Sequence, residues 1–296
     1  MAGSGPAGPR PGDRWPSAAT VVVGVMGHPV DHSLSPLLHN TAFARLGLDW
    51  VSVGFPVPVD GARAALGGLR ALGLAGLSVT MPFKAEVARL VDERTTAVAQ
   101  LGAANCVVRR GDHLVGHNTD GPGFVASLRR SAGFDPAGRR CLVLGAGGAA
   151  RAVVMALAEA GAAEVAVVNR TAEGAQRAAA LAGPAGRVGG AADAARADLV
   201  VNATPVGMTG TGAEGDRPLV DPGALGPGQV VADLVYHPRQ TAWLRAAAAR
   251  GVTTVGGLGM LVHQAALQLE LWTGEVAPVE DMWRAVEAVV GPAPAG

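Results

Sequence analysis

Cysteine is scarce in this chain of 296 residues, which has only Cys106 and Cys141. Both lie in apolar, strand-like segments, and neither belongs to a CxxC pair. Two such cysteines argue against a disulfide framework and against a cysteine-based zinc site. We therefore expect buried thiols, no bound metal and a location in the reducing cytoplasm.

The chain also lacks an excess of charge of either sign, with 24 basic and 24 acidic residues. A balanced charge produces no strong field to attract nucleic acid or a membrane, so small-molecule chemistry is the expected activity. Apolar runs are short, and none reaches the roughly 18 residues that indicate a membrane-spanning helix. Residues 1–17 contain glycine and proline at nearly every second position without an apolar signal core, which predicts a disordered tail.

A glycine-rich turn carries the clearest functional signal. It follows the apolar segment 141–144 and opens an alanine-rich helical stretch at residues 149–160. In the dinucleotide fingerprint the first glycine permits the turn, the second lets backbone N–H groups approach a pyrophosphate, and the helix N-terminus attracts the phosphates. A plain turn in an alanine-rich protein is the alternative, but the flanking strand and helix favour dinucleotide binding. The residues of the turn are Gly145, Ala146, Gly147, Gly148 and Ala149.

The residues after the next predicted strand, 164–168, indicate which nucleotide binds. They are Asn169, Arg170 and Thr171, whereas an NAD site carries Asp or Glu about 20 residues after the glycines. Arg170 can form charge-assisted bonds with a ribose 2′-phosphate, so the sequence favours NADP. A solvated cation at the strand end is the alternative role for Arg170, and Arg177 is the next basic residue.

Strand and helix patterns alternate along the chain, which indicates an α/β fold with two domains. We expect a substrate domain at residues 18–120 and a Rossmann-type dinucleotide-binding domain at residues 121–258, separated by a break at Gly121-Pro122-Gly123. Strands are predicted at residues 21–25, 50–55, 76–80, 141–144, 164–168, 199–202, 230–235 and 253–255, and a hairpin at 106–108 and 114–116.

Two C-terminal helices are predicted, at residues 260–272 and 279–290. The first is apolar nearly all round, and a helix of this kind must be buried. The second places Met282, Val286 and Val289 on one face. We therefore expect residues 259–296 to pack back against the first domain, so that the substrate domain is discontinuous.

Polar side chains gather beyond the predicted carboxyl ends of strands in the first domain, where open α/β sheets bind their ligands. Thr80, Lys84, Asn105 and Asp120 are the main examples, and they suit a small polyhydroxylated acid. Simpler roles are open to some of them, because a lysine is usually solvated and an aspartate before glycine can cap a helix. Ser35 precedes a proline and is a good candidate for a helix N-cap.

Six motifs resemble those of the shikimate dehydrogenase family and stand in the family's order. They are HSLSP (32–36), VTMPFK (79–84), NTDG (118–121), NATPVGM (202–208), DLVY (233–236) and GMLVHQ (259–264). The resemblance runs from residue 25 to about residue 272. It implies the reversible NADP-dependent reduction of 3-dehydroshikimate to shikimate, on the route to chorismate and the aromatic amino acids.

The resemblance also implies roles for single residues. Lys84 and Asp120 resemble the catalytic pair, in which a lysine held near an aspartate protonates a developing alkoxide. Ser33 and Ser35 resemble the hydroxyls that bind the substrate carboxylate. The implied contacts to the ring hydroxyls are Thr80, Asn105, Asp120, Tyr236 and Gln264. The implied cofactor contacts are the five residues of the glycine-rich turn together with Asn169, Arg170, Thr171, Thr204, Leu234 and Gly257.

Alternatives to these assignments stay open. Core packing is an equal alternative for Tyr236, whereas Gln264 lies in an apolar helix and needs a partner for its amide. A quinate/shikimate or aminoshikimate dehydrogenase with relaxed cofactor use is the nearest alternative function, and a catalytically silent NADPH-binding sensor is one from another class. The protein is expected to be a monomer or a homodimer.

The histidines lack metal-ligand spacing with cysteine or carboxylates, and we expect them in loops or behind the site. Two glycine-rich links are the last feature of the sequence. The links at residues 120–123 and 256–259 join the two domains and are predicted to absorb rotation when a cleft closes. The histidines considered are His28, His32, His39, His117, His237 and His263.

Overall fold

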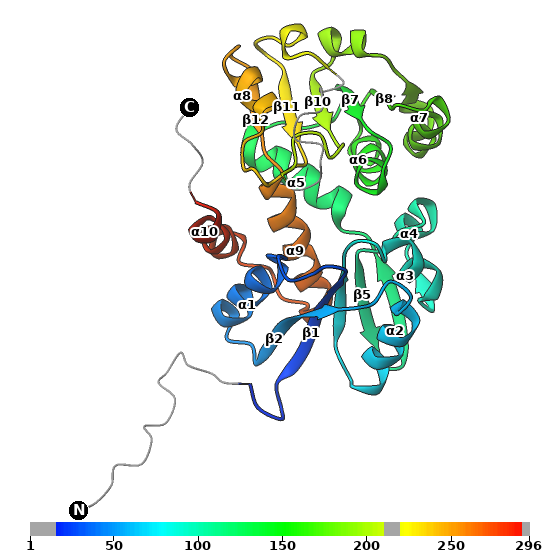
Figure 1. The fold of residues 1–296 in the computed structure, drawn as a ribbon, viewed down its shortest axis with the longest axis vertical. Coiled ribbons are helices and arrows are strands. Elements are labelled where there is room, and N and C mark those ends of the chain that lie inside the picture. Colours follow the sequence, from blue (N-terminus) through cyan, green and yellow to red (C-terminus); the bar gives the residue numbers. More distant parts are fainter. Residues whose placement is uncertain (1–15, 210–219, 292–296) are drawn as a thin grey trace, which may run out of the picture.

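Two six-stranded sheets organise the chain, one in each half of the molecule (Figure 1). The computed structural model describes residues 16–209 and 220–291. Most of the predicted N-terminal tail, residues 1–15, therefore lies outside the described residues. No helix in the two described ranges is long and apolar enough to cross a membrane.

The first sheet is mixed, with the strand order β2-β1-β3-β5-β6-β4. β1 pairs in parallel with β2 and β3, whereas β5 runs antiparallel to both β3 and β6. The predicted hairpin is present as β5 and β6. The strands are β1 (Val21–Gly27), β2 (Trp50–Pro56), β3 (Gly76–Val79), β4 (Glu93–Arg94), β5 (Cys106–Arg110) and β6 (His113–His117).

The second sheet is parallel throughout, with the order β12-β11-β10-β7-β8-β9. Numbered along this half of the chain, the order is that of the doubly wound dinucleotide-binding fold, in which ligands bind where the strand order reverses. That reversal lies between β7 and β10. The strands are β7 (Arg140–Leu144), β8 (Glu164–Val168), β9 (Gly186–Val188), β10 (Leu199–Asn202), β11 (Val230–Asp233) and β12 (Thr253–Val255).

Helices cover both sheets and connect them. α5 and α9 run between the two halves of the molecule, and α10 lies beside α1 (Figure 1). The α-helices are α1 (Ser35–Leu46), α2 (Ala62–Ala71), α3 (Lys84–Leu90), α4 (Thr96–Leu101), α5 (Asp120–Ala132), α6 (Gly148–Glu159), α7 (Ala172–Ala179), α8 (Ala242–Ala248), α9 (Leu258–Thr273) and α10 (Val279–Val290). The short 3₁₀ turns are η1 (Ala180–Ala185), η2 (Ala191–Arg196) and η3 (Pro222–Ala224).

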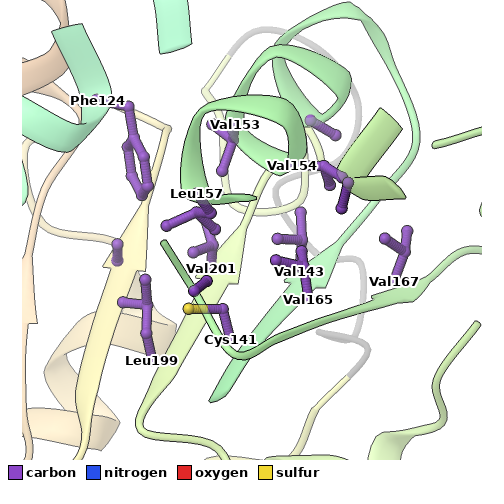
Figure 2. Close-up of a cluster of buried hydrophobic side chains, with 14 of the residues drawn as sticks. Phe124, Cys141, Val143, Val153, Val154, Leu157, Val165, Val167, Leu199 and Val201 are labelled. Carbon is purple, nitrogen blue, oxygen red and sulfur yellow. The ribbon is translucent and has the colours of Figure 1, made fainter. Parts of the chain in front are cut away.

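A buried apolar cluster fixes α6 on the second sheet (Figure 2). Side chains of β7, β8 and β10 meet those of α6, and Phe124 from α5 closes one side. Burial of a valine or leucine side chain stabilises the fold by about 1.5–3 kcal/mol. The N-terminus of α6 is therefore held firmly above the strand ends. The side chains that meet include Val143, Val165, Val201, Val153, Val154 and Leu157.

The C-terminal helices pack on α1, as their apolar sequence predicts. Leu38 and Phe43 of α1 share one buried cluster with α9 and with Met282 and Val286 of α10. The prediction for Val289 is wrong, because its side chain is 63% exposed. At about 100° per residue, the buried face of α10 is centred nearer Val286 and Val290, and Val290 packs on the cluster instead.

The predicted break at Gly121-Pro122-Gly123 is wrong, since these residues form the first turn of α5. The two glycines are explained by close packing. A Cβ atom on Gly121 would lie 2.6 Å from the Ala152 carbonyl oxygen of α6, and one on Gly123 would lie 2.7 Å from the Gln264 nitrogen of α9. Both glycines therefore let three helices approach one another where the two halves of the molecule meet.

Candidate active site

A cavity of about 200 Å³ lies between the two halves of the molecule. Its wall includes every side chain that the sequence analysis assigned to substrate binding: Ser33, Ser35, Thr80, Lys84, Asn105, Asp120, Tyr236 and Gln264. Three residues predicted to contact the cofactor, Ala149, Leu234 and Gly257, line the same cavity. The tertiary fold thus brings residues separated by more than 200 positions into one site.

Strand direction explains how Asn105 reaches this cavity. Thr80 follows the carboxyl end of β3 and Asp120 follows β6, as expected. Asn105 instead precedes β5, so its predicted place at a carboxyl end is wrong. Because β5 runs antiparallel to β3, with Cys106 opposite Ser78, its amino end lies at the same edge of the sheet.

Lys84 and Asp120 form an ion pair inside the cavity, with 2.7 Å between Nζ and Oδ2. The Asp120 side chain is 8% exposed, and its other oxygen accepts a hydrogen bond of 2.8 Å from Asn105 Nδ2. Asp120 is the first residue of α5, and Thr119 occupies the N-cap, so the capping role considered for Asp120 is wrong. Lys84 keeps two further N–H groups for a molecule in the cavity.

Ser33 and Ser35 lie at the amino end of α1. The capping role considered for Ser35 is also wrong, since Leu34 is the N-cap residue and Ser35 already belongs to the helix. The Ser33 hydroxyl accepts a hydrogen bond of 3.3 Å from the Ser35 backbone N–H. Both hydroxyls line the cavity beside the positive end of the α1 dipole, an arrangement that suits a carboxylate.

A buried amide network supports Asn105 and Gln264. The Asn105 side chain bonds to Thr119 and Asp120, and Gln268 donates to Gln264 Oε1 over 2.9 Å. Sequence reasoning missed Thr119 and Gln268. The sequence could have identified Gln268, because it stands one turn after Gln264 in the same apolar helix and its buried amide also needs partners.

The glycine-rich turn has the geometry that a pyrophosphate requires. Gly145 has φ of +110°, and a Cβ atom there would lie 2.9 Å from the Ala203 carbonyl oxygen. Gly147 is the N-cap of α6 and Gly148 its first residue, and a Cβ atom on either would meet nothing within 4 Å. The open space above the N-terminus of α6, at the reversal of strand order, fits a dinucleotide phosphate.

The residues predicted to select NADP lie beyond the carboxyl end of β8. Asn169 bonds locally to Thr171, which is the N-cap of α7. Arg170 is exposed and has no ion-pair partner among the described residues. Arg177, the alternative cation, is paired with Glu173 on the surface of α7. Of these two arginines, Arg170 is the one without an ion-pair partner among the described residues.

A second buried network holds the loops after β10 and β11. Asp233 accepts hydrogen bonds from Asn202 Nδ2 at 2.9 Å and from Thr241 Oγ1 at 2.7 Å. Thr204 donates to Asn202 Oδ1 at 2.6 Å, so its hydroxyl is engaged within this network. Burial raises the pKa of Asp233 to about 6. Sequence reasoning assigned no role to Asp233.

The remaining site predictions concern Gly257, Tyr236 and the histidines. A Cβ atom on Gly257 would lie 2.2 Å from the Leu234 carbonyl oxygen, so only glycine fits there. Tyr236 is partly buried against the α1–α9 cluster while it lines the cavity, and burial raises its pKa. His39 lies in α1 and not in a loop; it is fully buried against Trp272, and burial lowers its pKa to about 3. No metal-binding group of histidine, cysteine or carboxylate side chains occurs among the described residues.

The mixed sheet, the Rossmann-type sheet and the polar cavity between them define a two-domain α/β protein of the dinucleotide-binding class. The chain matches the shikimate dehydrogenase substrate binding domain at residues 25–107, shikimate / quinate 5-dehydrogenase at residues 128–214 and the shikimate 5'-dehydrogenase C-terminal domain at residues 257–287. It is 46% identical over 279 residues to the shikimate dehydrogenase (NADP(+)) of Methanopyrus kandleri, covering 91% of this chain and 96% of that one. This protein belongs to the shikimate dehydrogenase family.

Solved structures agree with this assignment. A shikimate dehydrogenase crystallised with NADP+ superposes with a TM-score of 0.87 at 34% identity, covering 97% of this chain and all of that one. The quinate dehydrogenase of Corynebacterium glutamicum, crystallised with NAD, superposes with a TM-score of 0.82 at 30% identity, covering 91% and 99%. The fold prediction of a substrate domain joined to a Rossmann-type domain is confirmed.

Proposed function

We propose that this protein is a shikimate dehydrogenase that reversibly reduces 3-dehydroshikimate to shikimate with NADPH, on the route to chorismate and the aromatic amino acids. One observation carries the proposal. The cavity that holds the Lys84–Asp120 pair is also lined by Ala149, Leu234 and Gly257 of the nucleotide-binding half. A substrate bound to the first group would therefore lie beside a nicotinamide bound by the second.

The catalytic role is assigned to Lys84 and Asp120. NADPH supplies the hydride when it is bound, and the substrate oxygen then gains negative charge. Lys84 stabilises that charge and delivers a proton to the oxygen. Asp120 Oδ2 orients the ammonium group, and Asn105 Nδ2 in turn holds the carboxylate of Asp120. In the reverse direction Lys84 accepts the proton from the shikimate hydroxyl.

Substrate binding is assigned to two groups of side chains. The hydroxyls of Ser33 and Ser35 donate hydrogen bonds to the substrate carboxylate at the amino end of α1. The ring hydroxyls are contacted by other side chains that line the cavity. The residues assigned to those contacts are Thr80, Asn105, Asp120, Tyr236 and Gln264.

Cofactor binding is assigned to the loops at the carboxyl edge of the second sheet. The turn of Gly145, Ala146, Gly147, Gly148 and Ala149 cradles the pyrophosphate. Arg170 meets the 2′-phosphate with help from Asn169 and Thr171. Thr204, Leu234 and Gly257 contact the remainder of the nucleotide beside the substrate cavity.

Initial rates with shikimate and quinate, each with NADP and with NAD, test the proposal. We expect kcat/KM to be highest for shikimate with NADP. A higher kcat/KM for quinate with NAD would establish the alternative dehydrogenase. NADPH binding without turnover of either substrate would instead establish a sensor, although such a protein has no need of the Lys84–Asp120 pair.

The domain boundaries, oligomeric state and location belong to the same proposal. We assign the substrate domain to residues 18–120 together with 259–296, and the dinucleotide-binding domain to residues 121–258. We propose a monomer or homodimer that works in the cytoplasm, which suits the free, buried thiols of Cys106 and Cys141. Sedimentation of the purified protein and fractionation of its source cells test the last two points.

A further inference from the structure

Gln264 reaches the cavity from α9, and the partners of its amide decide which of its atoms faces inward. Its Nε2 donates a 2.9 Å hydrogen bond to the Leu261 carbonyl oxygen. Its Oε1 accepts from Gln268 Nε2 at 2.9 Å and lies 3.4 Å from Asn105 Nδ2. A flipped amide would set oxygen against oxygen at Leu261 and nitrogen against nitrogen at Gln268, so the observed orientation is the one that satisfies the partners.

Gln268 supplies the main constraint on this orientation. Its own amide is fixed, because Nε2 also donates to the Asn105 backbone oxygen at 3.0 Å, and a carbonyl can only accept. Asn105 Nδ2 contributes little to Gln264, since its two hydrogens point to closer acceptors, Thr119 Oγ1 at 2.9 Å and Asp120 Oδ1 at 2.8 Å. Gln268 is therefore the close donor that fixes Gln264 Oε1.

The burial of the Gln268 amide lowers the stability of the fold, so packing alone does not explain why a glutamine occupies this position. The residue is fully buried, and its Oε1 has no hydrogen-bond partner among the described residues. A methionine or leucine would fill similar space without burying an unpaired acceptor. The donor function of Nε2 accounts for an amide at this position.

We propose that Gln268 is a positioning residue for substrate binding. By fixing the amide of Gln264, it makes Gln264 present an N–H donor to the cavity, because one hydrogen of Nε2 has no partner among the described residues. The site then favours a substrate oxygen at that point and disfavours a group that can only donate, such as an ammonium. This inference rests on the proposed function.

The test compares Gln268→Met with Leu269→Met, a matched control at the next buried position of the same helix. We expect Gln268→Met to raise KM for shikimate about fivefold or more, with KM for NADP unchanged and a melting temperature close to that of the control. The control should keep both KM values within twofold of the wild-type values. Gln268→Leu replaces the methionine variant if that variant does not fold.

A double-mutant cycle with Gln264→Met separates positioning from packing. If Gln268 acts through Gln264, Gln268→Met should change KM for shikimate less than twofold in the Gln264→Met background. An equal effect in both backgrounds, an unchanged KM in the single variant, or equal increases in KM for both substrates would overturn the inference. A wild-type protein that does not oxidise shikimate would refute the proposed function itself, a result distinct from any of these.

Discussion

Replacement of Lys84 by alanine tests the proposed chemistry most directly. The change removes the only cation paired with Asp120 in the described chain and leaves that carboxylate bonded to Asn105. Loss of a general acid lowers the rate by about 10² to 10⁴, so kcat should fall by that factor. The Lys84 side chain is 29% exposed, and Asp120 keeps its hydrogen bond from Asn105 Nδ2 when the lysine is removed. The protein should therefore fold and still bind NADPH.

The assay measures kcat and KM for shikimate, NADPH affinity by fluorescence titration, and the melting temperature. Arg89→Ala is the matched control, because Arg89 is an exposed cation on the same helix and lies outside the cavity. It should leave kcat unchanged. A kcat for Lys84→Ala within tenfold of the wild-type value, in a folded protein, would remove Lys84 from the proton transfer.

Three further predictions address the cofactor, the pH dependence of stability and motion. Arg170→Ala should raise KM for NADP about tenfold or more, because roughly 1.5–3 kcal/mol of binding free energy is lost, and should leave KM for NAD unchanged. Arg177→Ala is its control. An equal rise in KM for both cofactors would indicate general damage to the cofactor pocket. Asp233 has a pKa of about 6 in the folded protein and 3.8 in the unfolded chain, so it binds its proton more tightly in the native state. Its contribution to stability is therefore fullest below pH 3.8 and is lost as the pH rises through 6, by roughly 3 kcal/mol. Urea unfolding of the wild-type protein and Asp233→Asn at pH 4.5 and 7 should show a stability difference that depends on pH, and a constant difference would contradict this account. Shikimate and NADPH together should close the interdomain cleft, which scattering with and without both ligands can measure; identical profiles would indicate a preformed cleft.

The amino-acid sequence by itself determined the local elements and the residue types of the site. The alternation of strands and helices, the turn at Gly145 and the apolar C-terminal helices follow from short-range steric and hydrophobic patterns. The predicted substrate residues all line one cavity. Most of them stand beside strand ends that the fold collects at one edge of the first sheet, whereas Tyr236 follows β11 of the second sheet and Gln264 reaches the cavity from α9.

The tertiary structure decided what depends on strand direction and on distant contacts. Asn105 reaches the cavity only because β5 is antiparallel to β3. Gly121 and Gly123 continue a helix instead of breaking it. The close approach of α5 to α6 and α9 requires residues without side chains, and the packing between these helices offsets the low helix propensity of glycine. Gln268 stands one turn after Gln264, but its other partner, the Asn105 carbonyl oxygen, lies 163 positions earlier in the chain. Long-range pairs of this kind leave no local pattern in the sequence, since each is specified by the packing of the whole fold.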